Sequence, residues 1–414
     1  MPELVRFAVP PPTTTDPGRP CSALPPAASA PVPPPARVRA AYDPAVDAIV
    51  LSGGTGVTLK ALSRAVNRAN ALSETAPGEW LLGSDLQVRG DATLRITAPE
   101  VRWLKLRSDN RGFASLQAFG GRVEITGTCI TSWDTDQVRA DTAYEGGRSF
   151  ILARDGAQLV IDRSELRFLG FGERESYGLS WRNPGTGGGI TNSIVTDLYF
   201  GLYTYAVNGL TVTDNEFARN VLYGVDPHTG STNIRIQRNR VHDNGKHGII
   251  LAEDCTDNVI AGNLVYRNNH HGIVLYLRSD RNVVEGNESF GNTAQGINVN
   301  ESSDNVVRTN RLYDNESGVD IGQRARNNVV QDNLVRDNRD DGVRLVTDSD
   351  RTAVRNNVIG DNGRYGVYID TGGSTELTAN TVFGSRVGLS FAGTTGTNGN
   401  NDVYGNRERD VEQR

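Results

Sequence analysis

The feature of this sequence that most constrains its fold is an internal repeat of 22–24 residues. Segments such as NRVHDNGKHGIIL, NLVYRNNHHGIVL and NLVRDNRDDGVRL align with one another. The first asparagine of the repeat falls at 215, 239, 263, 287, 310, 333, 357 and 380, and a second falls five residues later in the first seven of these repeats. The repeat glycine falls at 178, 201, 224, 248, 272, 296, 318, 342, 366 and 388. A fixed period in this range is typical of a solenoid.

The composition of the repeat indicates which solenoid it forms. The leucine signature of leucine-rich repeats is missing, helical repeats need longer apolar-periodic segments, and the glycine-rich signature of the calcium-binding β-roll is absent. An all-β parallel β-helix with one coil per repeat remains. Identical side chains stack in such a fold, so we expect the repeated asparagines to form internal hydrogen-bonded ladders.

Composition changes divide the chain into four parts. Residues 1–37 are rich in Pro, Ala and Thr and predict a disordered leader or linker. Residues 38–78 predict an N-terminal cap region with one amphipathic helix at 58–72 behind Thr58. Short alternating runs predict the β-helix over residues 79–400, and residues 401–414 predict a polar C-terminal tail.

Charge and composition exclude several classes of partner. The net charge is -6 and the chain has no basic block, which argues against nucleic acid as a partner. It has no apolar run of the ~20 residues that a membrane helix needs, and we see no signal peptide. We expect a monomer. The three cysteines are too few for a disulfide framework, and we expect all three to be small buried hydrophobes.

The strand after each repeat glycine has two predicted faces. Its first and third residues are apolar (Ile249 and Leu251; Val319 and Ile321) and should point into the core, so its second and fourth should point outward. The outward residues, coil by coil, are Ser180 and Arg182, Tyr203 and Tyr205, Asp226 and His228, Ile250 and Ala252, Val274 and Tyr276, Asn298 and Asn300, Asp320 and Gly322, Arg344 and Val346, and Tyr368 and Asp370. Neighbouring coils stack ~4.8 Å apart. The sequence therefore predicts one face that carries arginine, tyrosine, aspartate and histidine, which suits a sugar polymer.

The stretch around Asp226-Pro227-His228 is similar to a known family. The run from GLYTYAVNGL to NNHHGIVL, with LSGGTGVTLKAL, TSWD and ESYGLSWR upstream, resembles the periplasmic mannuronan C5-epimerases of alginate biosynthesis over roughly residues 42–300. Those enzymes are right-handed parallel β-helices with an Asp-Pro-His-Asp signature. The resemblance implies the same fold, and C5-epimerisation of mannuronate in an anionic polysaccharide or oligosaccharide without cofactor or metal.

The resemblance also implies roles for residues of this chain. His228 would be the base that removes the C5 proton, Asp226 would orient or tune it, and Tyr223 is in the place of an acid. The residues expected to bind substrate are Arg182, Tyr203, Tyr205, Lys246, His247, Tyr276, Arg278, Asn298, Asn300, Asp320 and Arg344. Of the other histidines, we expect His242 to be structural, and His270 and His271 to flank the groove.

Two residues depart from the family pattern. The fourth signature position is Thr229, and the family's carboxylate-neutralising arginine aligns with Glu253, which should repel a uronate. Arg182, Arg278 or Lys246 would then have to neutralise the carboxylate. Two other hypotheses stay open: a lyase that expels the C4 substituent, and a silent carbohydrate-binding module. For localisation, the resemblance favours the cell envelope or exterior, while the missing signal segment leaves the cytoplasm as the alternative.

Overall fold

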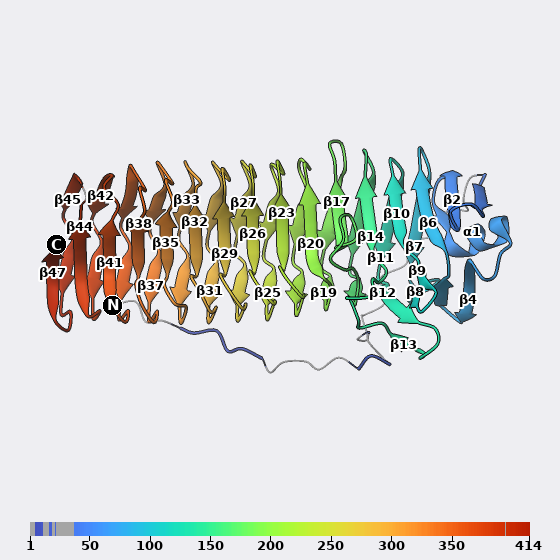
Figure 1. Ribbon diagram of the computed structural model, residues 1–414, viewed down its shortest axis with the longest axis horizontal. Coiled ribbons are helices and arrows are strands. Elements are labelled where there is room, and N and C mark those ends of the chain that lie inside the picture. Colours follow the sequence, from blue (N-terminus) through green and yellow to red (C-terminus); the bar gives the residue numbers. More distant parts are fainter. Residues whose placement is uncertain (1–4, 11–15, 19–20, 22–36, 394) are drawn as a thin grey trace.

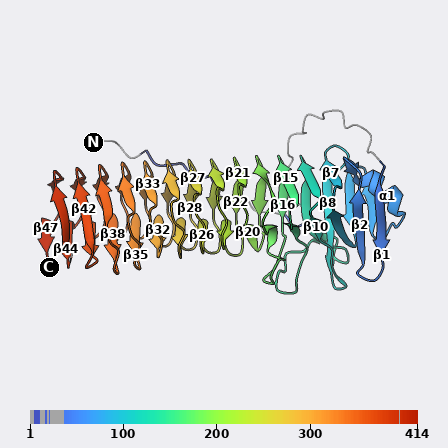
Figure 2. The ribbon, with the colours of Figure 1, turned by 90° about the horizontal axis from the view of Figure 1, so that it is seen from above.

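The computed structural model describes residues 5–10, 16–18, 21, 37–393 and 395–414. The chain winds into stacked coils along one long axis, with α1 beside the first coil, at the end of the stack opposite the C-terminus (Figures 1 and 2). Three sheets run along the stack, and each repeated coil contributes one strand to each of them. Most neighbours in a sheet are parallel and in register, as for β26 with β29 and β29 with β32. The predicted parallel β-helix is confirmed.

The first sheet carries the predicted outward face and comprises β1 (Arg39–Asp43), β2 (Ala48–Gly53), β6 (Asp85–Arg89), β10 (Leu116–Phe119), β14 (Ile151–Arg154), β17 (Gly178–Arg182), β20 (Phe200–Tyr205), β23 (Val225–His228), β26 (Ile249–Ala252), β29 (Ile273–Tyr276), β32 (Ile297–Asn300), β35 (Val319–Gly322), β38 (Val343–Val346), β41 (Tyr365–Asp370), β44 (Val387–Ala392) and β47 (Arg409–Gln413).

The second sheet comprises β3 (Val57–Thr58), β7 (Thr93–Thr97), β11 (Arg122–Thr126), β15 (Gln158–Asp162), β18 (Gly187–Thr191), β21 (Thr211–Thr213), β24 (Arg235–Gln237), β27 (Val259–Ala261), β30 (Val283–Glu285), β33 (Val306–Arg308), β36 (Val329–Gln331), β39 (Thr352–Arg355), β42 (Ser374–Thr378) and β45 (Thr395–Gly399).

The third sheet comprises β4 (Leu72–Ala76), β5 (Glu79–Leu82), β8 (Trp103–Asp109), β9 (Gly112–Phe113), β12 (Cys129–Asp134), β13 (Arg139–Ala140), β16 (Glu165–Arg167), β19 (Ile194–Thr196), β22 (Glu216–Ala218), β25 (Arg240–His242), β28 (Leu264–Tyr266), β31 (Glu288–Phe290), β34 (Arg311–Tyr313), β37 (Leu334–Arg336), β40 (Val358–Gly360), β43 (Thr381–Phe383) and β46 (Asp402–Tyr404).

One apolar core runs along the axis of the stack, from Ile49 to Leu389. Ile249, Leu251, Val319 and Ile321 are fully buried in it, which confirms the predicted inward positions of the strands. Because successive residues of a strand point to opposite faces, this assignment also fixes which residues of the first sheet point outward.

Asparagine ladders join the coils at their turns, as predicted. Asn239 Nδ2 donates to Asn263 Oδ1 at 3.0 Å, and Asn263 Nδ2 donates to Asn287 Oδ1 at 2.9 Å. A second ladder includes Asn268, whose Nδ2 donates to Asn292 Oδ1 at 3.0 Å. A third ladder, which the sequence reading missed, runs through Asn258, Asn282, Asn305 and Asn328. Each ladder amide also pairs with backbone groups of neighbouring coils, so buried polar atoms find partners.

The helix is shorter than predicted. α1 spans Leu59–Val66, with Thr58 as its N-cap, and Thr58 Oγ1 accepts a hydrogen bond from Ala61 N at 3.3 Å. The predicted extension to residue 72 is wrong, because Asn67 adopts a left-handed conformation (φ 51°) and ends the helix.

The coils extend beyond the predicted boundaries of 79 and 400. β2 pairs in parallel with β6, so the first coil begins inside the predicted cap region of residues 38–78. At the other end, β46 pairs with β43 and β47 with β44, so residues 401–414 are not a separate tail. Asn401 continues the first ladder by accepting from Asn380 Nδ2 at 2.9 Å. Backbone pairing therefore outweighs the polar composition of this segment.

The predicted leader at 1–37 lies largely outside the described residues. Its residues 5–10 contact the third sheet: Phe7 N donates to Tyr313 Oη at 3.1 Å, and Arg6 pairs with Asp314 at 2.9 Å. Cys21 forms a disulfide with Cys129, so the expectation of unpaired cysteines is wrong for these two. The disulfide joins the leader to β12 across a sequence separation of 108. Composition alone does not indicate a pairing over such a distance. Cys255 is free and buried, as predicted. No helix in the described ranges has the length and apolar character of a membrane span.

Candidate active site

The register of the first sheet brings the predicted outward residues into rows. Arg182 aligns with Tyr205, Tyr205 with His228, His228 with Ala252, Ala252 with Tyr276, and Tyr276 with Asn300. A second row contains Ser180, Tyr203 and Asp226, and continues from Ile250 through Val274, Asn298, Asp320 and Arg344. The predicted placement of these residues on one face of the sheet is confirmed.

A cleft of about 460 Å³ opens over β26, β29 and β32. Its lining contains seven of the predicted site residues, namely Tyr223, His228, Lys246, His247, Tyr276, Asn298 and Asn300, together with Ile250, Ala252, Glu253, His270, His271 and Val274. Ile250, Ala252 and Val274 pack together with Tyr223 and give the cleft an apolar floor. The other predicted residues, Arg182, Tyr203, Tyr205, Asp226, Arg278, Asp320 and Arg344, are not part of this lining.

His228 ends strand β23 and is half-buried at the edge of the cleft. Burial lowers the pKa of His228; Glu253 opposes this shift and Arg182 adds to it. The ring is therefore neutral near pH 7, the form that a general base requires. Its Nδ1 lies 2.7 Å from Thr229 Oγ1, and that hydroxyl donates to Glu253 Oε2 at 3.1 Å. Thr229, rather than Asp226, is thus the hydrogen-bond partner of the His228 ring.

Tyr223 and Lys246 form a pair where the chain enters β23 and β26, at the opposite ends of these strands from His228 and Glu253. Lys246 Nζ donates to Tyr223 Oη at 3.0 Å. The Tyr223 ring stacks on His247, with the ring centres 5.1 Å apart and an angle of 8°. The stack fixes the phenol, and the ammonium places a positive charge beside it.

Asp226 and Arg182 lie beneath the surface. Asp226 is fully buried, and neither of its carboxylate oxygens has a hydrogen-bond partner among the described residues. Burial raises the pKa of Asp226 well above its usual range, and Glu253 raises it further, so the protonated form is favoured. The Arg182 guanidinium packs against the rings of Tyr203 and Tyr205, at 5.0 and 5.1 Å. Burial, with Asp226 next in importance, raises the pKa of Tyr203, which therefore stays protonated.

Three histidines gather at the end of the cleft near Lys246. Nitrogen atoms of His247, His270 and His271 lie within 4.8 Å of one another. Burial lowers the pKa of His247 to about 2 and that of His271 to about 3, and the neighbouring histidines and Lys246 lower both pKa values further. Neutral imidazoles can ligate metals, but His271 Nδ1 already accepts from Gln295 N at 3.2 Å. Its Nε2 then carries the ring proton, so the cluster does not offer three free lone pairs in this arrangement. That the site needs no metal stays a prediction.

Several predicted substrate-binding residues already have charged partners. Arg278 is exposed on a turn and pairs with Asp254 at 2.7 Å. Arg344 pairs with Asp320 at 2.8 Å further along the sheet. Of the three cations expected to replace the family's arginine, Arg278 is paired and Arg182 is buried, whereas Lys246 belongs to the cleft lining.

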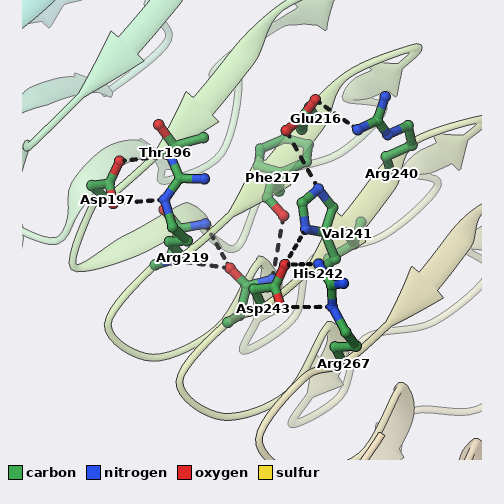
Figure 3. A network of polar contacts seen from close by, with 12 residues as sticks. Thr196, Asp197, Glu216, Phe217, Arg219, Arg240, Val241, His242, Asp243 and Arg267 are labelled. Carbon is green, nitrogen blue, oxygen red and sulfur yellow. Dashed lines mark hydrogen bonds and ion pairs between the residues drawn. The ribbon is translucent and has the colours of Figure 1, made fainter. Parts of the chain in front are cut away.

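His242 belongs to a polar network on the third sheet (Figure 3). Its Nδ1 lies 2.7 Å from Asp243 Oδ2, and its Nε2 lies 3.3 Å from Glu216 Oε1. Burial by itself would lower the pKa of His242. The hydrogen bonds and charges of Asp243 and Glu216 outweigh burial, so the pKa of His242 is raised. The ring stacks on Tyr266, with the ring centres 4.6 Å apart. These contacts agree with the predicted structural role.

The stacked coils and the cleft on the first sheet define the class of the protein. The chain belongs to the right-handed β-helix family: the family described as "Right handed beta helix region" matches residues 128–289 and 265–407.

Within this class, the chain is similar to mannuronan C5-epimerases. Mannuronan C5-epimerase AlgG of Azotobacter vinelandii is 34% identical over 297 residues, which are 68% of this chain and 55% of that protein. The mannuronan C5-epimerase of Pseudomonas fluorescens is 28% identical over 204 residues, which are 46% of this chain and 38% of that protein. This chain spans about half the length of the curated relatives that it matches. The crystal structure of the periplasmic alginate epimerase AlgG has the same fold, with a TM-score of 0.70, 24% identity, and coverage of 89% of this chain and 85% of that one.

Proposed function

We propose that this chain is an isomerase that inverts C5 of mannuronate residues in an anionic, alginate-like uronate chain. The observation that carries the proposal is the cleft itself, which pairs a neutral histidine at one end of its strands with a tyrosine and a lysine at the other. The similarity to mannuronan C5-epimerases supports the same reaction. A cleft of about 460 Å³ is within the range of ligand sites in proteins.

In the proposed reaction, a ring nitrogen of His228 takes the C5 proton. The electron pair of the broken C–H bond moves into the C6 carboxylate and gives an enolate-like intermediate with additional negative charge. Lys246 stabilises that charge. Tyr223 then donates its phenolic proton to C5 from the other face, and Lys246, already bonded to the phenol oxygen, stabilises the phenolate. Exchange with water restores both residues.

Aromatic and amide side chains along the cleft would hold the rest of the sugar chain. Tyr276, Asn298 and Asn300 lie on the two strands that follow β26, so an extended chain would cross successive coils. Tyr205 is part-exposed on the preceding strand and extends this path towards the N-terminus, whereas Arg182 and Tyr203 are buried beneath it. In this proposal Asp226 tunes the surroundings of His228 without contacting substrate, because it is fully buried.

We also propose a location in the cell envelope or outside the cell. Stable disulfides are typical of oxidising compartments, and Cys21 and Cys129 form one. The similar AlgG structure is described as periplasmic.

Proton NMR of polymannuronate incubated with the protein in heavy water tests the reaction. We expect deuterium at C5 together with new guluronate signals. His228→Ala should abolish both, whereas His242→Gln, a histidine change on the third sheet, should preserve them. Unsaturated chain ends would instead establish a lyase, in which the electron pair expels the C4 oxygen. Binding of polymannuronate without any exchange at C5 would establish a silent binding module.

A further inference from the structure

The two departures from the family signature contact each other in the structure. Thr229 Oγ1 lies 2.7 Å from His228 Nδ1 and donates to Glu253 Oε2 at 3.1 Å. Glu253 therefore has a defined partner beside the cleft. The three side chains form a chain of hydrogen bonds that starts at the predicted base and crosses from one coil to the next.

Thr229 has a single hydroxyl proton, and this proton determines which atom donates in each of the two hydrogen bonds. An ionised carboxylate only accepts hydrogen bonds, so the Thr229 proton goes to Glu253. The hydroxyl oxygen can then only accept from His228, and Nδ1 must carry the ring proton. In the neutral ring this leaves Nε2 with a free lone pair. The nitrogen that a hydrogen bond does not engage is thus the one prepared to accept a proton.

The backbone holds Thr229 in a left-handed turn conformation, as it does Ala206 and Glu253 at the same position of the neighbouring coils. Its φ of 31° lies in the left-handed region, which is unfavourable for a β-branched residue. Stacked turns maintain it: Thr229 N donates to Ala252 O at 2.8 Å, and Gly230 N donates to Glu253 O at 2.9 Å. The same two bonds keep Thr229 and Glu253 side by side on neighbouring coils.

We propose that Thr229 and Glu253 are positioning residues that hold His228 in its Nδ1–H tautomer and present Nε2 to the substrate. Glu253 then acts through Thr229 as a counter-charge for the imidazolium that forms when His228 takes the proton, which offsets its repulsion of a uronate. The catalytic consequence rests on the proposed function, but the tautomer does not. The other charged or titratable groups near the His228 ring are Arg182, Tyr203, Tyr205 and Asp226. The ring makes its hydrogen bond to Thr229.

Nitrogen NMR of the protein labelled with ¹⁵N-histidine tests the tautomer without substrate. His228→Gln assigns the signals of the ring. We expect a protonated Nδ1 and an unprotonated Nε2 in the unmodified protein. Thr229→Val, which replaces the hydroxyl by a methyl group, and Glu253→Met, which removes the acceptor, should both lose this preference, whereas Thr229→Ser should keep it. A protonated Nε2 in the unmodified protein overturns the proposal, even if no variant folds.

Kinetics test the consequence. Thr229→Val should lower kcat about 10- to 100-fold with little change in KM, because the base is misoriented while the sugar contacts remain. Thr229→Ser should restore most of the rate. Glu253→Met should also move the acidic limb of the kcat/KM profile to lower pH, because Glu253 raises the pKa of His228. Unchanged rates in Thr229→Val would refute the positioning role. An inactive unmodified protein with the expected tautomer would refute only the epimerase function.

Discussion

Replacing His247 by phenylalanine should change how the stability of the protein depends on pH. The native ring has a pKa of about 2, lowered by burial and then by His271, His270 and Lys246, against an ordinary value of 6.5. Between these values the unfolded chain binds a proton that the native chain does not. The free energy of unfolding must therefore fall as the pH drops below about 6.5, and His247 contributes to that fall.

The size of the effect follows from the two pKa values. Between pH 7.5 and pH 5, a histidine with an unfolded pKa of 6.5 and a native pKa of about 2 costs about 2 kcal/mol of stability. His271, with a native pKa of about 3, contributes a similar amount. His247→Phe keeps a ring against Tyr223 but cannot titrate. Relative to the unmodified protein, the free energy of unfolding of the His247→Phe variant should rise by about 2 kcal/mol between pH 7.5 and pH 5.

Urea unfolding followed by circular dichroism at a series of pH values measures this difference. His242→Gln is the matched control of opposite sign. The pKa of His242 is raised in the native state, so its contribution is fully present below 6.5 and is lost as the pH rises through the native value. That variant should lose stability relative to the unmodified protein as the pH falls. A His247→Phe difference that stays constant within about 0.5 kcal/mol would refute the reasoning, because it would mean that His247 titrates normally in the folded protein.

Three further experiments test other parts of the molecule. Asn268→Ala removes a ladder rung and the buried hydrogen bonds of its side chain with Asn244, Val241 and Asn292. Urea unfolding should therefore show a loss of at least about 3 kcal/mol, against less than about 0.5 kcal/mol for the exposed neighbour in Asn269→Ala. Lys246→Met removes the cation of the cleft and should lower kcat/KM for polymannuronate about 100-fold, whereas Lys60→Met on α1 should leave it unchanged. If the Lys246→Met variant kept the rate of the unmodified protein, another residue would have to neutralise the carboxylate. Alkylation of the denatured, unreduced protein should modify Cys255 alone, and mass spectrometry showing three modified cysteines would contradict the Cys21–Cys129 disulfide.

The repeat made the fold and most of the outward face predictable. Because side chains alternate along a strand, finding Ile249 and Leu251 inward was enough to place Ile250 and Ala252 outward, and the same rule placed Asp226 and His228. The predictions failed at the ends of the repeat. Asn67 ended the helix early, and residues 401–414 joined the sheets although their composition is polar.

The sequence also predicted which residues lie on the outward face of the first sheet, but not how deeply each is buried. Asp226 and His228 lie two residues apart on one strand, yet Asp226 is fully buried and His228 reaches the cleft. Arg182 was expected on the surface and is instead buried, with its guanidinium packed against two tyrosine rings. Depth depends on which neighbouring side chains cover a position, and a repeat pattern does not encode that.

The sequence by itself determined the parallel coils, the two predicted asparagine ladders and the identity of the residues on the outward face, because period and alternation are local properties of a strand. Only the tertiary structure decided how the functional groups bond. The contact of Thr229 with Glu253, the stack of Tyr223 on His247 and the Cys21–Cys129 disulfide each join residues that are more than twenty positions apart. Such contacts depend on turn conformations and on the packing of neighbouring coils, which arise only when the coils stack.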